Sequence, residues 1–424
     1  MGVVSCGTTM LDQGVFENIG AVTWDTTVKT SGFTAVSGNG YFCNTTSGAF
    51  TVTLPSSPSA GDIVAVADYA ATFDTNNLTL GRNSSNIGGD AADSILSTEG
   101  IAVTLVFIDA TKGWLVTNSG LQSEASSPKY VTATGGTITT IGDFKVHAFT
   151  GPGTFCVSCA GNAAGSTVVS NFLVVAGGGG GGRADIGGGG GAGGLRNLSC
   201  VSITAQGYPI VVGGGGAAQP CLGQGNNGSN STGISITSTG GGGGGGAAPP
   251  YVAEPGSPGG SGGGGANAAG VGGNGNSPAV SPAQGFDGGD RGSQGKGGGG
   301  GGAIEEGYPS NPSPNEAVGG AGLNVSPFFG SSPQPFYQAN STCRGATVCG
   351  QFAGGGGGAG DGPGGQQGGV GGVGGGGKGS SPGNASGYAG TVNAGGGGGA
   401  GENTRGGGGA GGSGIVLIKY KFQN

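Results

Sequence analysis

Cys156 and Cys159 form a C-x-x-C motif, a spacing that occurs in zinc and redox sites. A zinc site needs a second pair of ligands at a suitable spacing. The next cysteines, Cys200 and Cys221, do not supply such a pair, and His147 is the only histidine. The segment TFCVSC predicts a β-strand, in which the two sulfur atoms would lie on opposite or shifted faces of the sheet. We interpret both cysteines as ordinary thiols; later disulfide formation and a metal site are the alternatives.

Two pairs of carboxylates, Asp287 with Asp290 and Glu305 with Glu306, have spacings that occur in glycosidases and in calcium sites. The glycine–aspartate repeat of calcium-binding β-helices does not accompany them. We therefore interpret these side chains as groups that cap or solvate the rim of the glycine-rich region.

Lys378 and His147 also have simple structural interpretations. The segment GGGGKGS resembles a phosphate-binding loop, but Gly379 stands where Ser or Thr would bind magnesium, and no strand or helix flanks it. His147 lies in the alternating segment FKVHAFT, which predicts a partly buried structural imidazole. We expect no catalytic residue, no metal and no cofactor, and we expect that the protein is not an enzyme.

The composition restricts the class of protein. Of the 424 residues, 114 are glycine and 20 are proline, yet only 8% are charged, which is unlike a charge-rich disordered chain. A net charge of −7 without a basic stripe argues against binding to nucleic acid. No apolar run approaches the roughly 20 residues of a membrane helix, and the first residues do not resemble a secretory signal. We expect a protein made in the cytoplasm without membrane insertion.

Short strands with alternating polarity predict a mainly β protein with almost no α-helix. Residues 1–120 predict an N-terminal β-sandwich module, and residues 121–129 predict a linker. Strands resume in residues 130–212, a second β-core with a first glycine-rich excursion, and residues 414–424 predict a last strand that is central in its sheet. Residues 213–413 are then a glycine-rich insertion with both ends held by this β-core.

Polyproline II is the conformation that suits the glycine runs. It has three residues per turn and no internal hydrogen bonds, so its N–H and C=O groups need partners on neighbouring segments. A segment with neighbours on several sides needs glycine at nearly every position, because side chains would keep the backbones apart. The runs that meet this requirement are Gly240–Gly246, Gly297–Gly302, Gly354–Gly358, Gly395–Gly399 and Gly406–Gly409. They predict a polyglycine II sandwich with loops at both ends.

The strand and glycine segments FLVVAGGGGGGRADIGGGGGAGG, YPIVVGGGG and GGSGIVLIKY resemble the glycine-rich domain of bacteriophage virion proteins. That domain resembles the polyglycine sandwich of adhesins at the tips of long tail fibres. The segment YFCNTTSGAFTVTLPSSPSAGDIVAVAD is similar to a β-module of marine-phage and cyanophage structural proteins. The resemblance implies a protein on the surface of the virion, and a homotrimer.

The loops between the glycine runs hold most of the aromatic residues of the insertion. The candidates for receptor binding are Tyr251, Tyr308, Phe328, Phe329, Phe336, Tyr337 and Tyr388. Exposed rigid aromatics give binding area at little entropic cost. In the alternative interpretation, these side chains fold back and cover the polyglycine II sandwich. Both interpretations hold if Phe328 and Phe336 are buried and the tyrosines point outward. Cys343 and Cys349 bracket a short loop and are the pair best placed for a disulfide.

These observations predict a phage fibre or adhesin that recognises a host surface glycan or outer-membrane protein without catalysis. The N-terminal module would attach to other virion proteins. One alternative is a head-decoration or fibre-shaft protein without a receptor role. Another is an ice- or surface-binding protein, although the irregular loop lengths argue against the flat face that ice binding needs.

Overall fold

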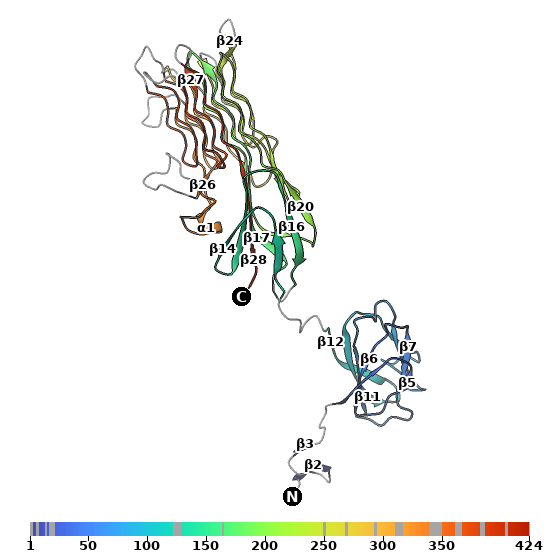
Figure 1. Cartoon of the computed structure of the whole chain (residues 1–424). Helices are drawn as coiled ribbons and strands as arrows, with labels where there is room; N and C mark the ends of the chain where they lie inside the picture. The colour runs from blue at the N-terminus through green and yellow to red at the C-terminus, as the bar shows by residue number, and fades with distance from the viewer. Residues whose placement is uncertain are drawn as a thin grey trace. The chain divides into compact units, whose positions relative to one another are not determined.

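The computed structural model describes most of the chain: residues 3–5, 8–12, 15–16, 22–121, 129–162, 165–248, 252–267, 270–291, 295–309, 317–338, 350–360, 367–381, 386–402 and 406–423. The chain is mainly β, as predicted, and one short helix, α1 (Ser326–Phe329), occurs among these residues (Figure 1). No helix in the described ranges has the length and apolarity needed to span a bilayer. The chain divides into two compact units, Met1–Ser127 and Pro128–Asn424. This division falls inside the segment 121–129 that was expected to be a linker.

The first unit contains a β-sandwich. One sheet has the order β12-β11-β8-β6-β4 and the other β10-β9-β7-β5. The strands are β4 (Thr23–Lys29), β5 (Phe33–Thr34), β6 (Asn39–Cys43), β7 (Phe50–Thr53), β8 (Ile63–Asp68), β9 (Leu78–Gly81), β10 (Ser94–Leu96), β11 (Ile101–Asp109) and β12 (Gly113–Leu121). A separate small sheet comprises β1 (Val3–Ser5), β2 (Thr8–Asp12) and β3 (Val15–Phe16). Apolar side chains such as Leu54, Leu78, Leu105 and Trp114 form the sandwich core.

The strand order of this sandwich has a feature that the sequence pattern did not predict. From β4 to β9 the chain alternates between the two sheets, and successive strands within each sheet are parallel. The chain therefore winds like a solenoid, and each strand of the other sheet serves as the crossover that parallel pairing requires. The antiparallel hairpin of β11 and β12 follows these turns.

The second unit begins with a β-core of two sheets. Their orders are β13-β16-β20 and β14-β15-β28-β17-β19. The strands are β13 (Val131–Thr134), β14 (Thr137–Ile141), β15 (Phe144–Phe149), β16 (Gly153–Ala160), β17 (Val168–Val175), β19 (Leu195–Ser202), β20 (Gly207–Ile210) and β28 (Ile415–Lys421). The C-terminal strand β28 is central in the larger sheet, as its apolar sequence predicted, and pairs with β15 and β17.

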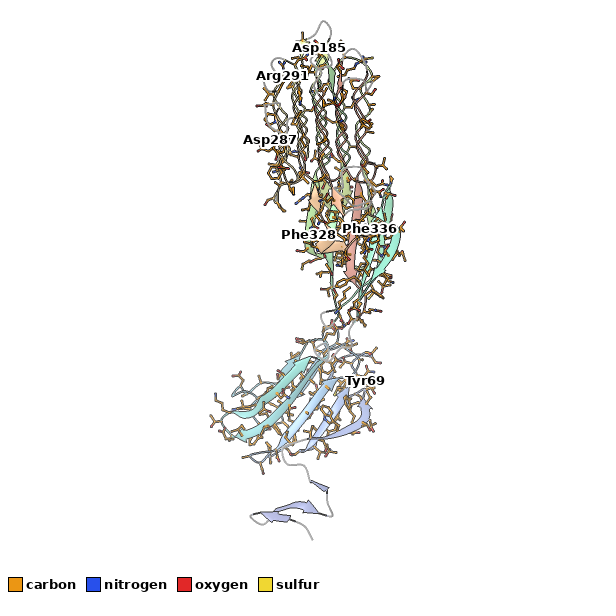
Figure 2. All side chains as sticks on the ribbon, turned by 90° about the vertical axis from the view of Figure 1, so that its left-hand side faces the viewer. Tyr69, Asp185, Asp287, Arg291, Phe328 and Phe336 are labelled. Atoms are coloured by element: carbon orange, nitrogen blue, oxygen red, sulfur yellow. The ribbon has the colours of Figure 1, made fainter. Side chains whose placement is uncertain are left out.

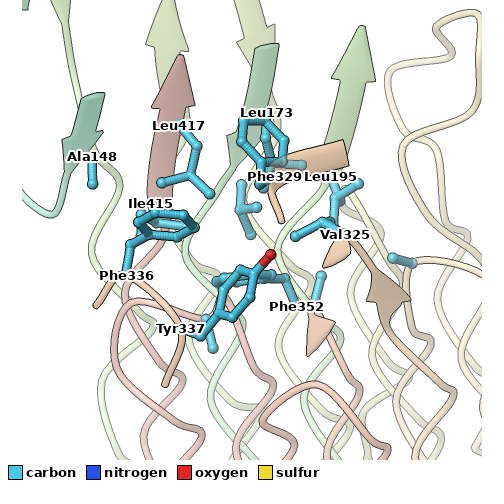
Figure 3. Close-up of a cluster of buried hydrophobic side chains, with 14 of the residues drawn as sticks. Ala148, Leu173, Leu195, Val325, Phe329, Phe336, Tyr337, Phe352, Ile415 and Leu417 are labelled. Atoms are coloured by element: carbon cyan, nitrogen blue, oxygen red, sulfur yellow. The ribbon is translucent and has the colours of Figure 1, made fainter. Parts of the chain in front are cut away.

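The central strands β17 and β28 of this larger sheet are buried on both faces. Alternate residues of β17 and β28 point to opposite faces, so Phe172 and Ile418 pack toward Phe155 of the smaller sheet. On the other face, Leu173 and Leu417 belong to a second cluster. The residues that cover this face come from the insertion and include Val325, Phe329, Phe336, Tyr337 and Phe352 (Figure 3).

The first glycine run, residues 177–182, shows how the glycine segments associate. The N–H groups of Gly178 and Gly181 donate to the carbonyls of Gly412 and Gly409, at 2.9 Å each. The N–H groups of Gly177 and Gly180 donate to a second neighbour, at Ser229 and Asn226. Those of Gly179 and Gly182 donate to a third neighbour, at Gly191 and Gly188. Partners on a given neighbour thus recur every three residues, which is the repeat of the polyproline II helix.

The carbonyls of the same run accept hydrogen bonds from three further segments. Gly216 donates to Gly178, Gly241 to Gly177, and Gly398 to Gly179. Residues 177–182 therefore bond six neighbouring segments. Residues 188–194 are enclosed in the same way, by segments at 176–182, 239–245, 261–264, 298–301, 356–359 and 395–398. We call the hydrogen-bonded segments within residues 177–194 and 213–414 the glycine array; it confirms the predicted polyglycine II sandwich.

The expected boundaries placed the sandwich in residues 213–413, with residues 176–194 as an excursion of the β-core. In the structure, this excursion lies at the centre of the glycine array, because its ends are held by the adjacent strands β17 and β19 while other segments surround it. Figure 1 shows the array segments running side by side beyond the ends of the β-core strands. Short strands within residues 177–194 and 213–414 are β18 (Arg183–Ala184), β21 (Ser231–Gly233), β22 (Ile236–Ser238), β23 (Ala247–Ala248), β24 (Val252–Ala253), β25 (Leu323–Asn324), β26 (Gln351–Phe352) and β27 (Gly401–Glu402).

Steric exclusion explains why the inner segments are glycine. A Cβ atom added to Gly179 would lie under 3.0 Å from the carbonyl oxygen of Gly242, and one added to Gly190 would clash with the carbonyl of Gly179. Outer segments have a free side and carry side chains there: Val271, Phe286, Val370 and Tyr388 are exposed. The inner segments thus make the platform, and the outer segments determine its surface chemistry.

Candidate binding groove on the glycine array

An open groove of about 650 Å³ lies on the outer segments of the glycine array. We call it the tyrosine groove, because Tyr308 and Tyr388 both line it although 80 positions separate them in the sequence. The other lining residues are Glu305, Val318, Gly319, Ala321, Val370, Gly371, Gly372, Val373, Gly376, Gly377, Lys378, Ala389 and Thr391. Of the aromatic residues predicted to bind a receptor, these two tyrosines are brought together in one surface feature.

Backbone hydrogen bonds on two sides hold the segment that carries Tyr388. On one side, Gly387 and Gly390 donate to Gly407 and Ala410, at 3.0 and 2.8 Å. On the other side, Tyr388 and Thr391 donate to Lys378 and Gly375, at 2.9 and 2.8 Å. The backbone is therefore fixed by the array while the Tyr388 side chain remains 54% exposed.

Tyr308 is held by both its backbone and its hydroxyl group. Its N–H donates to the carbonyl of Val318, and its own carbonyl accepts from Gly299, both at 3.0 Å. The hydroxyl donates to the Oε1 atom of Glu305, and this carboxylate raises the pKa of Tyr308. The Oε2 atom of Glu305 also accepts from the N–H of Ala321 at 3.3 Å. The half-buried ring is thus fixed at the groove rather than free to rotate away.

The side chains that line the groove repeat every three residues. The pairs are Glu305 and Tyr308, Val318 and Ala321, Val370 and Val373, and Tyr388 and Thr391. A segment with three residues per turn places residues three apart on one side, so each pair forms a stripe facing the groove. This period-three pattern was the sequence signal that could have identified Val370, Val373 and Thr391 as surface residues.

Residues 150–421 match the family described as "Glycine-rich domain". This chain belongs to the glycine-rich domain family. The match runs from just after β15 to the last residue of β28, so it includes the glycine array and most of the β-core. A search of curated proteins found no match to the sequence.

The aromatic residues near α1 do not face solvent in the glycine-rich domain. Phe329, Phe336 and Tyr337 are buried, and Phe328 is partly buried against the same cluster. Burial raises the pKa of Tyr337 to about 12, and its hydroxyl donates to the carbonyl of Gly330 at 2.7 Å. The structure therefore favours the alternative interpretation, in which these aromatic side chains fold back, and Figure 2 shows Phe328 and Phe336 at the β-core. The expectation that Tyr337 points outward is wrong, because its side chain is only 4% exposed. The four side chains cover the β-core sheet, whose apolar outer face would otherwise meet water.

Two expectations concern residues outside the described ranges. Tyr251 and the cysteine pair Cys343 and Cys349 lie there, so both remain predictions. Cys156, Cys159, Cys200 and Cys221 are free thiols, of which Cys159 is half-buried and the others are exposed. Among the described residues, no group of three or more His, Cys, Asp or Glu side chains is arranged to hold a metal ion.

His147 and the carboxylates have structural partners. His147 is fully buried, with Nδ1 at 2.6 Å from the carbonyl of Gly135 and Nε2 at 3.1 Å from the Tyr420 hydroxyl. Burial lowers the pKa of His147. Asp287 and Asp290 accept from the N–H groups of Gly275 and Gly272, at 2.6 and 2.8 Å. These contacts support a structural role for His147, which is fully rather than partly buried as expected, and for the two aspartates, which cap backbone N–H groups.

Lys378 lies in an array segment rather than in a phosphate-binding loop. Its neighbours Gly377 and Ser380 donate their N–H groups to Gly397 and Ala400, at 2.9 Å each. These N–H groups therefore face another segment of the domain and do not converge on a ligand. The side chain of Lys378 contributes instead to the tyrosine groove.

Proposed function

We propose that this protein is a bacteriophage fibre or adhesin that recognises a bacterial surface receptor without catalysis, through its glycine-rich domain. The observation that carries the proposal is the tyrosine groove on the glycine array. Backbone hydrogen bonds hold the segments that carry Tyr308 and Tyr388 before any ligand binds. A surface ordered in advance loses little conformational entropy on binding, and this favours affinity.

The proposal assigns a separate role to each compact unit. The N-terminal unit, Met1–Ser127, would attach to other virion proteins, and the glycine-rich domain would contact a host glycan or an outer-membrane protein. The resemblance to phage structural proteins supports a position on the particle surface and a homotrimer. Several copies on one particle would add avidity to a weak single-site affinity.

The test of this function uses the full chain. Fluorescently labelled protein is added to a panel of marine bacteria, cyanobacteria included, and phage adsorption to the labelled strains is measured with and without excess unlabelled protein. We expect labelling of particular strains and slower adsorption of phages that carry this protein. Labelling of no strain that such a phage infects would contradict the proposal.

The alternative function is a head-decoration or fibre-shaft protein without a receptor role. In that case neighbouring virion chains would cover the tyrosine groove. Antibodies against the glycine-rich domain distinguish the two functions when intact particles are viewed by electron microscopy. Labelling at the ends of fibres supports the adhesin, and labelling spread over the capsid supports the decoration protein.

A further inference from the structure

The outer segments of the glycine array leave polar backbone groups directed away from it. In the segment of Lys378, Gly376 and Gly379 donate to Gly372 and Gly369, while Gly377 and Ser380 donate to another neighbour. With three residues per turn, the N–H of Lys378 points in a third direction, away from both of these neighbours. Among the described residues this N–H has no hydrogen-bond partner.

The segment of Tyr388 repeats this arrangement. Its residues 387 and 390 donate to one neighbour and residues 388 and 391 to another, so the N–H of Ala389 also points away from the array. It too has no partner within the described ranges. Lys378 and Ala389 both line the tyrosine groove, so these two N–H groups belong to residues that border it together with the exposed ring of Tyr388.

We infer that the tyrosine groove binds an oligosaccharide. The faces of the sugar rings would lie against Tyr388 and Tyr308, and their hydroxyls would bond the N–H groups of Lys378 and Ala389 and the carboxylate of Glu305. This inference rests on the proposed recognition function and names the chemical class of its ligand. A volume of about 650 Å³ lies within the range of small-ligand sites, roughly 300–1,000 Å³.

The charges and the shape of the groove favour a hydroxylated, uncharged ligand. Lys378 and Glu305 contribute one positive and one negative side chain, so the groove has no net charge that would select an ion. The glycines at 371, 372, 376 and 377 add no side chains to the lining, which leaves room for a flat ring. Hydroxyl groups both donate and accept, and therefore suit a lining that holds donors and a carboxylate acceptor.

A proline-rich peptide is the competing ligand, because it adopts the same helix as the array segments. Such a peptide would lie as one more segment and would need close backbone contact along the groove. The side chains of Val370 and Tyr388 are 52% and 54% exposed on this surface and would hold its backbone away. Rings that stack on a tyrosine meet no such obstacle.

The test compares full-length wild-type protein with Tyr388→Ala and with the control Phe286→Ala. Phe286 is 40% exposed and does not line the groove, so its loss removes an aromatic ring of similar exposure elsewhere. The probes are fluorescent oligosaccharides released by mild acid from bacterial surface polysaccharide, and a fluorescent hexaproline peptide. Binding is followed by fluorescence anisotropy, and thermal melting verifies that each variant is folded.

We expect saccharide binding by the wild-type protein, at least a tenfold loss of affinity in Tyr388→Ala, and unchanged affinity in Phe286→Ala. Binding of hexaproline alone, equal saccharide affinity in all three proteins, or no saccharide binding would overturn the inference. In those cases, wild-type protein that still labels bacterial cells leaves the recognition function standing. Protein that labels no cells contradicts the recognition function itself.

Discussion

The hydroxyl of Ser231 donates a hydrogen bond of 2.8 Å to the carbonyl of Val175, the last residue of strand β17. The same hydroxyl accepts from the N–H of Gly213 at 2.8 Å, and Ser231 is fully buried. At this point the chain passes from the β-core into the glycine array. Ser231 thus bonds one backbone group of the β-core and one of the glycine array at their junction.

Replacement of Ser231 by alanine tests the importance of this junction. The carbonyl of Val175 and the N–H of Gly213 would both lose a buried partner, so we expect the free energy of unfolding to fall by about 1–3 kcal/mol. Chemical denaturation of the full chain measures the change. Ser202→Ala, at an exposed position of β19, is the control and should change stability by less than about 0.5 kcal/mol. Equal effects of the two substitutions would contradict the role of Ser231.

Two glycine-to-alanine substitutions test the packing of the array. At Gly179 the added methyl group would overlap the carbonyl of Gly242, and we expect a loss of about 3 kcal/mol or more, or failure to fold. At Gly214 a Cβ would meet nothing within 4 Å, so alanine should be neutral or should stabilise by about 0.4–1 kcal/mol. Thermal melting of both variants distinguishes them. Similar melting temperatures would show that Gly179 is not enclosed.

Phe336 should contribute to stability and not to recognition. It is buried beside Ile415 and Leu417, and truncation to alanine should cost about 3–5 kcal/mol (Figure 3). Phe286→Ala removes an exposed ring and should change the melting temperature little. If Phe336→Ala melts like the wild type but labels bacteria more weakly, Phe336 is a contact residue after all.

His147 predicts how stability depends on pH. Burial holds the pKa of the native imidazole below its usual value, whereas the unfolded chain returns to about 6.5. Below that pH the unfolded chain takes up a proton that the native imidazole does not. The free energy of unfolding should therefore fall with decreasing pH, by up to about 1.4 kcal/mol per unit, and this contribution should be constant above about pH 7.5.

Urea unfolding between pH 8 and pH 5 measures this dependence. His147→Gln removes the titrating group, and its stability should change less with pH over the same range. The sequence contains no other histidine that would produce the effect. A variant with the same slope as the wild type would assign the dependence to other groups.

Much of the fold could be predicted because it depends on local sequence. The apolar run at 415–420 indicated a central strand, and the glycine runs indicated polyproline II segments. Both inferences follow from physical needs that each segment shows on its own: a strand buried on both faces must be apolar, and a segment enclosed by neighbours must lack side chains. The parallel winding of the first unit could not be predicted in this way, because alternating polarity is the same for parallel and antiparallel half-buried strands.

The candidate site was predicted less completely. Tyr308 and Tyr388 were named from the sequence, but so were Phe329, Phe336 and Tyr337, which are buried. Proline-rich loops and aromatic side chains are compatible with a binding surface and with a small core. Whether such aromatic side chains stay exposed or become buried depends on which apolar surface lies nearby. Here they pack on the face of the β-core sheet that the smaller sheet does not cover.

The sequence by itself determined the conformation of the glycine runs, because only residues without side chains allow backbones to approach on every side. It also determined that the last strand belongs inside a sheet. Only the tertiary structure decided that residues 177–194 lie at the centre of the array and that Tyr308 and Tyr388 share a groove. These facts depend on hydrogen bonds between segments far apart in the chain, and identical glycine runs carry no information about which neighbours they bond.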